Sequence, residues 1–130
     1  MTNDELLQLM KRFRVAYGTA NRDELLATTT SDFVWHQNFA MSDDDLPTGR
    51  ILTGVDALLK EIERRGQQWT NVRYENMQER ATADMLVQTF SISGEDNGEV
   101  FFANAVDLYP VKDGQIAKKD TYWKYRVCYR

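Results

Sequence analysis

The most informative stretch of the sequence is Asp107-Leu-Tyr-Pro-Val-Lys-Asp-Gly-Gln-Ile116. At its centre, Lys112-Asp113-Gly114 has the composition of a short hairpin loop, because Asp and Gly tolerate the backbone angles of tight turns. The residues before and after this loop are rich in Val, Tyr, Phe, Trp and Thr, which are typical of strands. The stretch therefore predicts two antiparallel strands, at residues 99–110 and 115–129.

The sequence before this hairpin continues with the same period of two residues. Residues 70–80 and 83–93 have a strand composition, and a second hairpin loop, Gly94-Glu-Asp-Asn-Gly98, follows them. The four long strands should therefore form an antiparallel meander. A shorter strand is expected earlier in the chain, at residues 32–38, and residues 51–52 are expected to pair briefly.

Three amphipathic helices are predicted before the meander. The first, residues 4–17, has apolar residues at spacings of four, three and four positions, as expected for one stripe of a helix: Leu6, Met10, Phe13 and Tyr17. The second covers residues 24–29, and the third follows Gly54 and ends at Gly66. On the third helix we expect the charged side chains to face water: Lys60, Glu61, Glu63, Arg64 and Arg65.

The order of these elements indicates an α+β fold. Helix, helix, strand and helix precede four strands, so the helices should cover one face of a curved antiparallel sheet and leave the other face open. The chain has 130 residues, of which 42% are hydrophobic, and it contains three Trp, six Tyr and six Phe. This composition suffices for one hydrophobic core, and we expect a single domain over residues 1–130.

Composition excludes several classes of function. The longest apolar run, Val100–Ala103, is far shorter than the ~20 residues of a membrane span or the ~7 residues of a signal-peptide core. A net charge of −4 with scattered basic residues argues against nucleic-acid binding. One His and one Cys cannot form a structural zinc site or an intramolecular disulfide. We therefore expect a cytoplasmic protein without a metal or other cofactor, in which Cys128 is a reduced thiol.

The order of elements and several sequence features resemble the NTF2-like superfamily, in particular its SnoaL-like and ketosteroid-isomerase-like members. The features include the stretch 107–116, the strand end Val34-Trp-His36 and the segment Asp120-Thr-Tyr-Trp-Lys124 of the last strand. The resemblance covers nearly the whole chain and implies a cone-shaped curved sheet, the cystatin-like α+β roll, which encloses an apolar pocket under the helices. Members include isomerases, cyclases, dehydratases and proteins without catalysis, so this fold does not set the function.

Asp107 is the first candidate for a chemical role. Its neighbours on the same face of the strand are apolar or aromatic: Ala103, Ala105 and Tyr109. An ionised carboxylate among apolar atoms is costly, so this group should be paired, hydrogen-bonded or kept protonated, and a protonated acid can donate a hydrogen bond to an enolate. By motif position, Asp107 matches the oxyanion-hole Asp of the isomerases that the chain resembles. The alternative is a strand carboxylate satisfied by a neighbouring side chain or by water.

Two other positions depart from the isomerase pattern. The family's oxyanion tyrosine on the first helix corresponds to Phe13, which cannot donate a hydrogen bond, and its general-base Asp corresponds to Gln37, which cannot accept a proton. Tyr17, one turn further along the helix, could replace the phenol, and His36 could replace the base. Strand alternation opposes a role for His36, because it faces away from the pocket if Trp35 and Gln37 face it. The His36 ring could instead anchor a loop through a backbone carbonyl.

The last strand supplies further candidates. The resemblance places Lys119, Thr121 and Trp123 toward the pocket, where Trp123 would be a stacking surface and Lys119 a counter-charge to Asp107. The full set of candidate ligand-binding residues is Phe13, Trp35, Gln37, Lys119, Thr121 and Trp123. The opposite side of this strand alternates charges with Tyr122 and belongs to the open face of the sheet, through which the resemblance implies a homodimer.

Two functions fit these features. The first is a cofactor-independent isomerase, dehydratase or cyclase that moves a proton on a small hydrophobic substrate, with Asp107, His36 and Tyr17 as candidate catalytic residues. The second is a non-catalytic dimeric domain that binds a hydrophobic ligand or acts as an accessory to a partner. The acidic run Asp43–Asp45 is either a guide for a cationic ligand or, as such runs more often are, a solvated loop.

Overall fold

The computed structural model describes residues 1–39 and 48–126. This part of the chain contains the following elements in order: α1 (Asn3–Thr19), α2 (Arg22–Thr28), β1 (Thr29–Gln37), β2 (Arg50–Thr53), α3 (Gly54–Gln68), β3 (Trp69–Thr82), β4 (Met85–Asp96), β5 (Glu99–Lys112) and β6 (Gln115–Tyr125). The predicted order of elements is confirmed, and so is the short pairing at residues 51–52. Cys128 and the acidic run Asp43–Asp45 lie outside the described residues.

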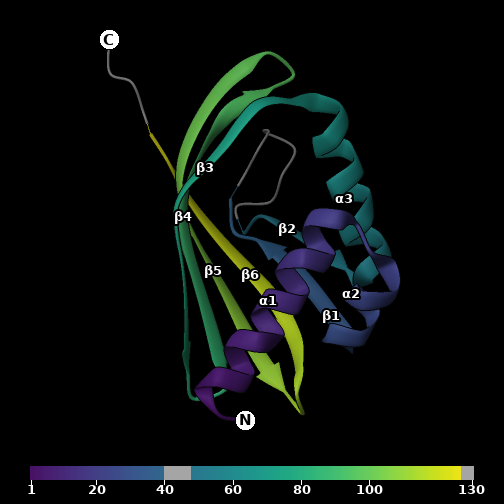
Figure 1. Ribbon diagram of the computed structural model, residues 1–130. Coiled ribbons are helices and arrows are strands. Elements are labelled where there is room, and N and C mark those ends of the chain that lie inside the picture. Colours follow the sequence, from purple (N-terminus) through teal and green to yellow (C-terminus); the bar gives the residue numbers. More distant parts are fainter. Residues whose placement is uncertain (40–47, 127–130) are drawn as a thin grey trace.

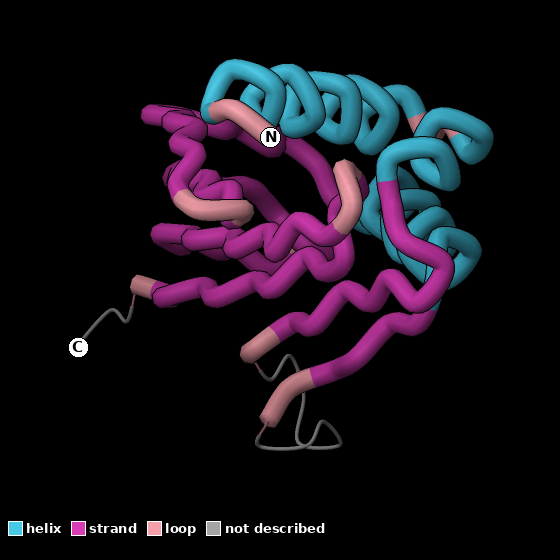
Figure 2. Tube along the Cα trace, turned by 90° about the horizontal axis from the view of Figure 1, so that it is seen from below, coloured by secondary structure: helices cyan, strands magenta, loops and turns pink. Residues whose placement is uncertain are grey.

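The helices cover one face of the sheet and leave the other face open. Figure 1 shows α1 and α3 beside the curved sheet, and Figure 2 shows the helices as a layer over it. α1 begins with a capping box, in which the Thr2 hydroxyl accepts a hydrogen bond from the Glu5 backbone N–H and the Glu5 carboxylate accepts one from the Thr2 N–H. The predicted α+β architecture is thereby confirmed. No helix in the described residues is long and apolar enough to span a membrane.

The sheet is mixed and has the strand order β2-β1-β6-β5-β4-β3. β3 to β6 form the predicted antiparallel meander. β1, in contrast, pairs in parallel with β6, and Trp35 lies opposite Lys119. The expectation of a purely antiparallel sheet is therefore wrong at this pair. The reason is that a long stretch of chain, including α3, separates the two strands, and a crossover of this length can return the chain in the same direction.

The core lies between the helices and the face of the sheet that they cover. A larger cluster joins the three helices with the strands and includes Phe13, Trp35 and Tyr109. A smaller cluster on β4 and β5 includes Ile92 and Ala103. Several polar side chains are also buried on the covered face: Gln88, Asp107, Lys119 and Thr121. Buried polar groups need partners, so the contacts of these residues define the candidate site.

Candidate functional site

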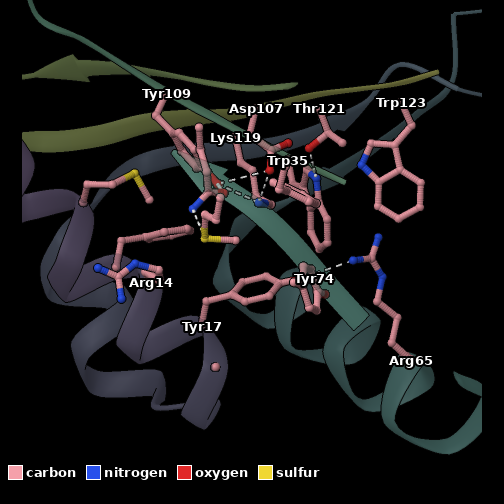
Figure 3. Close-up of a pocket in the computed structure, with 16 residues that line it drawn as sticks. Arg14, Tyr17, Trp35, Arg65, Tyr74, Asp107, Tyr109, Lys119, Thr121 and Trp123 are labelled. Atoms are coloured by element: carbon pink, nitrogen blue, oxygen red, sulfur yellow. Dashed lines mark hydrogen bonds and ion pairs between the residues drawn. The ribbon is translucent and has the colours of Figure 1, made fainter. Parts of the chain in front are cut away.

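A cavity of about 220 Å³ lies between α1, α3 and the covered face of the sheet. Its walls are mostly aromatic or apolar, and Figure 3 shows the side chains that line it. They include most of the candidate residues from the sequence: Phe13, Tyr17, Trp35, Asp107, Lys119, Thr121 and Trp123. A cavity with apolar walls and a few converging polar groups is typical of a small-molecule site.

Asp107 and Lys119 form an ion pair in the wall of the cavity. Lys119 Nζ lies 3.0 Å from Asp107 Oδ2, and the two side chains are 8% and 1% exposed. Alternation along β5 and β6 brings both side chains to the covered face. Of the states expected for a buried Asp107 carboxylate, the structure therefore shows the one in which it is paired with a cation. The other oxygen, Asp107 Oδ1, is buried and has no hydrogen-bond partner among the described residues.

Tyr109 holds this ion pair in place. Its hydroxyl accepts a hydrogen bond from Lys119 Nζ at 2.7 Å and can donate to Gln88 Oε1 at 3.1 Å or to Asp107 Oδ2 at 3.4 Å. Gln88 lies opposite Asp107 on β4 and donates from Nε2 to Glu79 Oε2 at 2.8 Å. A chain of hydrogen bonds thus extends from β3 to the ion pair, and it restricts the positions that the Asp107 and Lys119 side chains can take.

Burial shifts the pKa values of the groups around the ion pair. Loss of hydration lowers the pKa of Lys119, and the charge of Asp107 only partly opposes this shift. Loss of hydration also raises the pKa of Tyr109 well above its usual value and raises the pKa of Tyr17. Both phenols therefore keep their protons at neutral pH and can act as hydrogen-bond donors.

Tyr17 on α1 lies near the ion pair in the cavity (Figure 3). Lys119 Nζ is 5.0 Å from the centroid of the Tyr17 ring. The Tyr17 hydroxyl accepts a hydrogen bond from Arg65 Nη1 at 3.2 Å. Because this bond uses a lone pair of the hydroxyl, the O–H proton can be donated to a ligand. Phe13, one turn earlier, packs against Tyr109 with ring centroids 5.5 Å apart and supplies only apolar surface.

Arg65 lies at one end of the cavity among indole rings. Its guanidinium carbon is 4.8, 4.3 and 5.4 Å from the ring centroids of Trp35, Trp69 and Trp123. Cation–π contacts of this kind stabilise a charge that has lost much of its water. Trp35 is fixed in turn, because its Nε1 donates to Thr121 Oγ1 at 2.8 Å. These contacts give the cavity a rigid aromatic end.

Glu61 and Arg65 correct the expectation that the charged side chains of α3 face water. Both residues are buried, at 5% and 9% exposure. Glu61 accepts hydrogen bonds from Arg65 Nε at 3.1 Å and from Arg64 Nε at 2.8 Å. The sequence contains a signal for this arrangement. Leu58, Glu61 and Arg65 are spaced by three and four positions, so the two charged residues continue the apolar stripe of the helix.

His36 and Gln37 are not among the residues that line the cavity. His36 Nε2 donates to the backbone carbonyl of Thr48 at 2.8 Å, which is the loop-anchoring alternative. Gln37 is buried, but its side chain donates to Glu61 at 3.2 Å and accepts from Arg50 Nη2 at 2.9 Å. The structure therefore places the candidate base His36 outside the cavity, because successive residues of β1 point to opposite faces of the sheet.

Several polar side chains of the cavity have no role in the hypothesis from sequence, among them Arg65, Gln88 and Tyr109. Tyr109 is predictable, because it lies two residues from Asp107 and therefore faces the same side of β5. Gln88 is not, since its position opposite Asp107 depends on the register between β4 and β5. No group of three or more His, Cys, Asp or Glu side chains in residues 1–39 and 48–126 could hold a metal ion.

Solved structures with the same fold cover most of this chain. An NTF2-like protein of Burkholderia xenovorans LB400 is similar with a TM-score of 0.79 and 19% identity, over 95% of this chain and 92% of that chain. A proposed polyketide cyclase of Xanthomonas campestris pv. campestris is similar with a TM-score of 0.68 and 16% identity, over 94% of this chain and 92% of that chain. At these identities the likeness shows the fold alone.

A third similar structure is a Catenulispora acidiphila DSM 44928 protein with a ketosteroid isomerase-like fold, in complex with trimethylamine. Its TM-score is 0.65 at 14% identity, over 89% of this chain and 85% of that chain. No curated protein has a significantly similar sequence. The sequence pattern of the SnoaL-like domain, however, matches residues 10–119. With its helices over a curved sheet and its NTF2-like neighbours, the chain therefore belongs to the SnoaL-like domain family.

Proposed function

We propose that the chain is an enzyme that moves a proton on a small, mostly apolar carbonyl compound, and that Asp107 is its base. The observation that carries this proposal is the unequal environment of the two Asp107 oxygens. Lys119 holds Oδ2, whereas Oδ1 is buried without a partner within residues 1–39 and 48–126. A buried acceptor without a partner is costly, so it is expected where a ligand supplies the missing donor or proton. His36 has no part in the proposal, because it lies outside the cavity.

The proposed reaction begins with proton removal from a carbon next to the carbonyl group. Asp107 Oδ1 takes the proton, and the electrons of the C–H bond form the C=C bond of an enolate. Negative charge develops on the carbonyl oxygen, to which the Tyr17 O–H donates a hydrogen bond. Return of the proton to a different carbon completes an isomerisation. Attack of the enolate on a second carbonyl completes an aldol-type cyclisation.

The walls of the cavity support a compact substrate with apolar surface. A volume of about 220 Å³ and aromatic walls favour a cyclic or aromatic compound. The likeness to a proposed polyketide cyclase supports carbonyl compounds as the class, because polyketides are rich in carbonyl groups. Arg65 at the aromatic end can orient a substrate oxygen, since only its Nε and Nη1 donate to protein acceptors among the described contacts.

The test has two stages. A thermal-shift screen of steroid, aromatic polyketide-like and terpenoid ketones identifies compounds that bind. For each compound that binds, NMR in D₂O measures how fast deuterium from solvent enters the position next to the carbonyl group. We expect exchange with the unmodified protein. Asp107→Asn should slow the exchange at least about 100-fold because it removes the base, and Tyr17→Phe should slow it about 100-fold because it removes the donor to the enolate.

The matched control is Asp113→Asn, which changes an exposed carboxylate in the turn between β5 and β6 and should leave exchange unchanged. Binding without exchange would favour the second function, a non-catalytic domain that holds a hydrophobic ligand. Exchange that continues at the same rate in the Asp107→Asn variant would show that Asp107 is not the base.

A further inference from the structure

The contacts of Lys119 point to a covalent role for this residue. We propose that Lys119 Nζ condenses with the carbonyl group of the substrate to form an iminium, a protonated Schiff base. The inference rests on the proposed function, which supplies the class of substrate, a carbonyl compound. It goes beyond that function because it assigns bond formation to a residue that otherwise serves only as the counter-charge of Asp107.

The position of the amine supports this role. Lys119 lines the cavity, and its side chain is 8% exposed. Nζ donates to Asp107 Oδ2 and to the Tyr109 hydroxyl. An ammonium group has three N–H donors, so one N–H of Lys119 has no acceptor among the described hydrogen bonds. The rings of Tyr17, Trp35 and Tyr109 surround Nζ with centroids 5.0, 5.2 and 5.0 Å away, and they limit its access to water.

A lysine attacks a carbonyl group only as the neutral amine. Burial lowers the pKa of Lys119, which increases the fraction of this form near neutral pH. Asp107 Oδ2, at 3.0 Å, is placed to receive the proton that the ammonium group loses. A surface lysine lacks both the burial and the neighbouring carboxylate, and water stabilises its charged form.

The proposed step balances in atoms and charge. Lys119 passes one proton to Asp107, and the neutral Nζ forms a bond to the carbonyl carbon while the C=O π electrons move to oxygen. The oxygen takes up a proton from the nitrogen and becomes a hydroxyl group. Asp107 then returns its proton to this hydroxyl, which leaves as water as the C=N bond forms. The products are one water and an iminium with a single positive charge.

The iminium keeps the ion pair intact, because its positive charge replaces that of the ammonium beside Asp107. It also makes the neighbouring C–H bond more acidic than the parent ketone does, since the electrons of that bond can move to a cationic nitrogen. Asp107 Oδ1, which has no hydrogen-bond partner in the part of the chain that the structure describes, belongs to the same side chain that pairs with Lys119. Base and electron acceptor would thus act on adjacent atoms of the substrate, and in this route the iminium nitrogen takes the electrons that the carbonyl oxygen takes in the proposed function.

Reductive trapping tests the inference directly. The unmodified protein is incubated at pH 7 with benzaldehyde or cyclohexanone, and sodium cyanoborohydride reduces any iminium to a stable amine. Peptide mapping by mass spectrometry then locates the label. We expect Lys119 to carry more label than Lys118, because burial lowers the pKa of Lys119 and so increases its fraction of neutral amine. Lys118 is the control within the same molecule, since it points to the open face with a side chain 33% exposed.

Lys119→Arg is the matched variant. It keeps a positive charge beside Asp107 but cannot form an iminium, so the label should disappear from this position while ketone binding in the thermal-shift assay persists. Equal labelling of Lys118 and Lys119 in the unmodified protein would overturn the inference, whether or not the variant folds. Deuterium exchange that requires Asp107 but continues in Lys119→Arg would overturn it and leave the proposed function standing. Label at Lys119 without deuterium exchange would support the iminium and contradict the proposed function.

Discussion

At the scale of single residues, Glu61 combines burial with strong pairing. Its side chain is 5% exposed and lies 3.3 Å from Arg50, 2.8 Å from Arg64 and 3.1 Å from Arg65. Burial alone would raise the pKa of Glu61, but the hydrogen bond from Arg64 and the charge of Arg65 outweigh it and lower the pKa from 4.5 to about 2. Glu61 also holds Arg65, which in turn donates to Tyr17. The carboxylate therefore supports the donor of the proposed site from a distance.

The depressed pKa predicts how stability depends on pH. The folded protein binds the Glu61 proton more weakly than the unfolded chain does, so this group stabilises the fold above pH 4.5 and the contribution is lost as pH falls toward 2. Glu61→Gln should lower the free energy of unfolding by roughly 3 kcal/mol at pH 7 and by much less near pH 2. Chemical denaturation at several pH values measures the difference.

Glu63→Gln is the control for this prediction, because Glu63 is an exposed acid on the same helix. Its unfolding curves should follow those of the unmodified protein within about 0.5 kcal/mol. A constant difference between Glu61→Gln and the unmodified protein from pH 7 to pH 2 would contradict the account of Glu61.

Residues of the candidate site differ in how far sequence alone reveals them. Asp107 stands out because a carboxylate within an apolar strand is unusual, and Tyr17 follows from the helical stripe that it shares with Phe13. The residue type of Arg65 argues against a place in the site, because a charged residue on an amphipathic helix is normally assigned to the solvated face. Its burial depends on the ion pair with Glu61 and on the surrounding indole rings, of which Trp35 and Trp123 come from strands distant in the sequence.

At the scale of elements, the start of β2 depends on a close approach between two backbones. Gly49 has φ of +84°, and a Cβ atom there would lie 1.8 Å from the carbonyl oxygen of Gln37 on β1. Gly49→Ala should therefore destabilise the protein by more than about 3 kcal/mol, because backbone atoms cannot yield as a flexible side chain can. Thermal unfolding of the variant measures this loss.

Gly114→Ala separates steric overlap from backbone strain. Gly114 also has a positive φ, +77°, but a Cβ atom there would meet nothing within 4 Å. Its substitution should cost only about 1 to 2 kcal/mol, which is the penalty for the left-handed conformation. Equal losses for the two variants would show that the contact with Gln37 is unimportant.

Sequence predicts which elements form better than it predicts how they are paired. The periods of two and of three to four residues identify the long strands and the helices, because side-chain burial imposes those periods. Strand neighbours are chosen by backbone hydrogen bonds, which leave no period in the sequence. The parallel pairing of β1 with β6 is therefore missed, although the antiparallel hairpins, whose turns are short, are found.

At the scale of the whole molecule, the open face of the sheet is the surface through which we predict that two chains associate. Val106 and Tyr122 lie opposite each other on β5 and β6, and they are 37% and 44% exposed. Lys118, Asp120 and Lys124 surround them on β6 with charges of both signs. A twofold axis through such a face can place each charge near an opposite charge of the second copy.

Light scattering coupled to size-exclusion chromatography tests this association. The unmodified protein should elute with twice the mass of one chain, and Val106→Lys should shift it to the mass of one chain because it places a charge in the apolar centre of the contact. Val15→Lys is the control, since Val15 is 51% exposed on α1, on the other side of the sheet. A single-chain mass for the unmodified protein would contradict the prediction.

The parallel pairing of β1 with β6 also determines when the sheet can finish folding while the chain is being synthesised. β1 is made early, yet β6 is the last of the described elements to leave the ribosome. Contacts between segments so distant in sequence form only after a large loss of chain entropy, which slows folding. Until β6 arrives, the inner edge of β1 remains open. A nascent chain therefore carries an unpaired strand edge next to Phe33 and Trp35, the kind of surface that chaperones protect from aggregation.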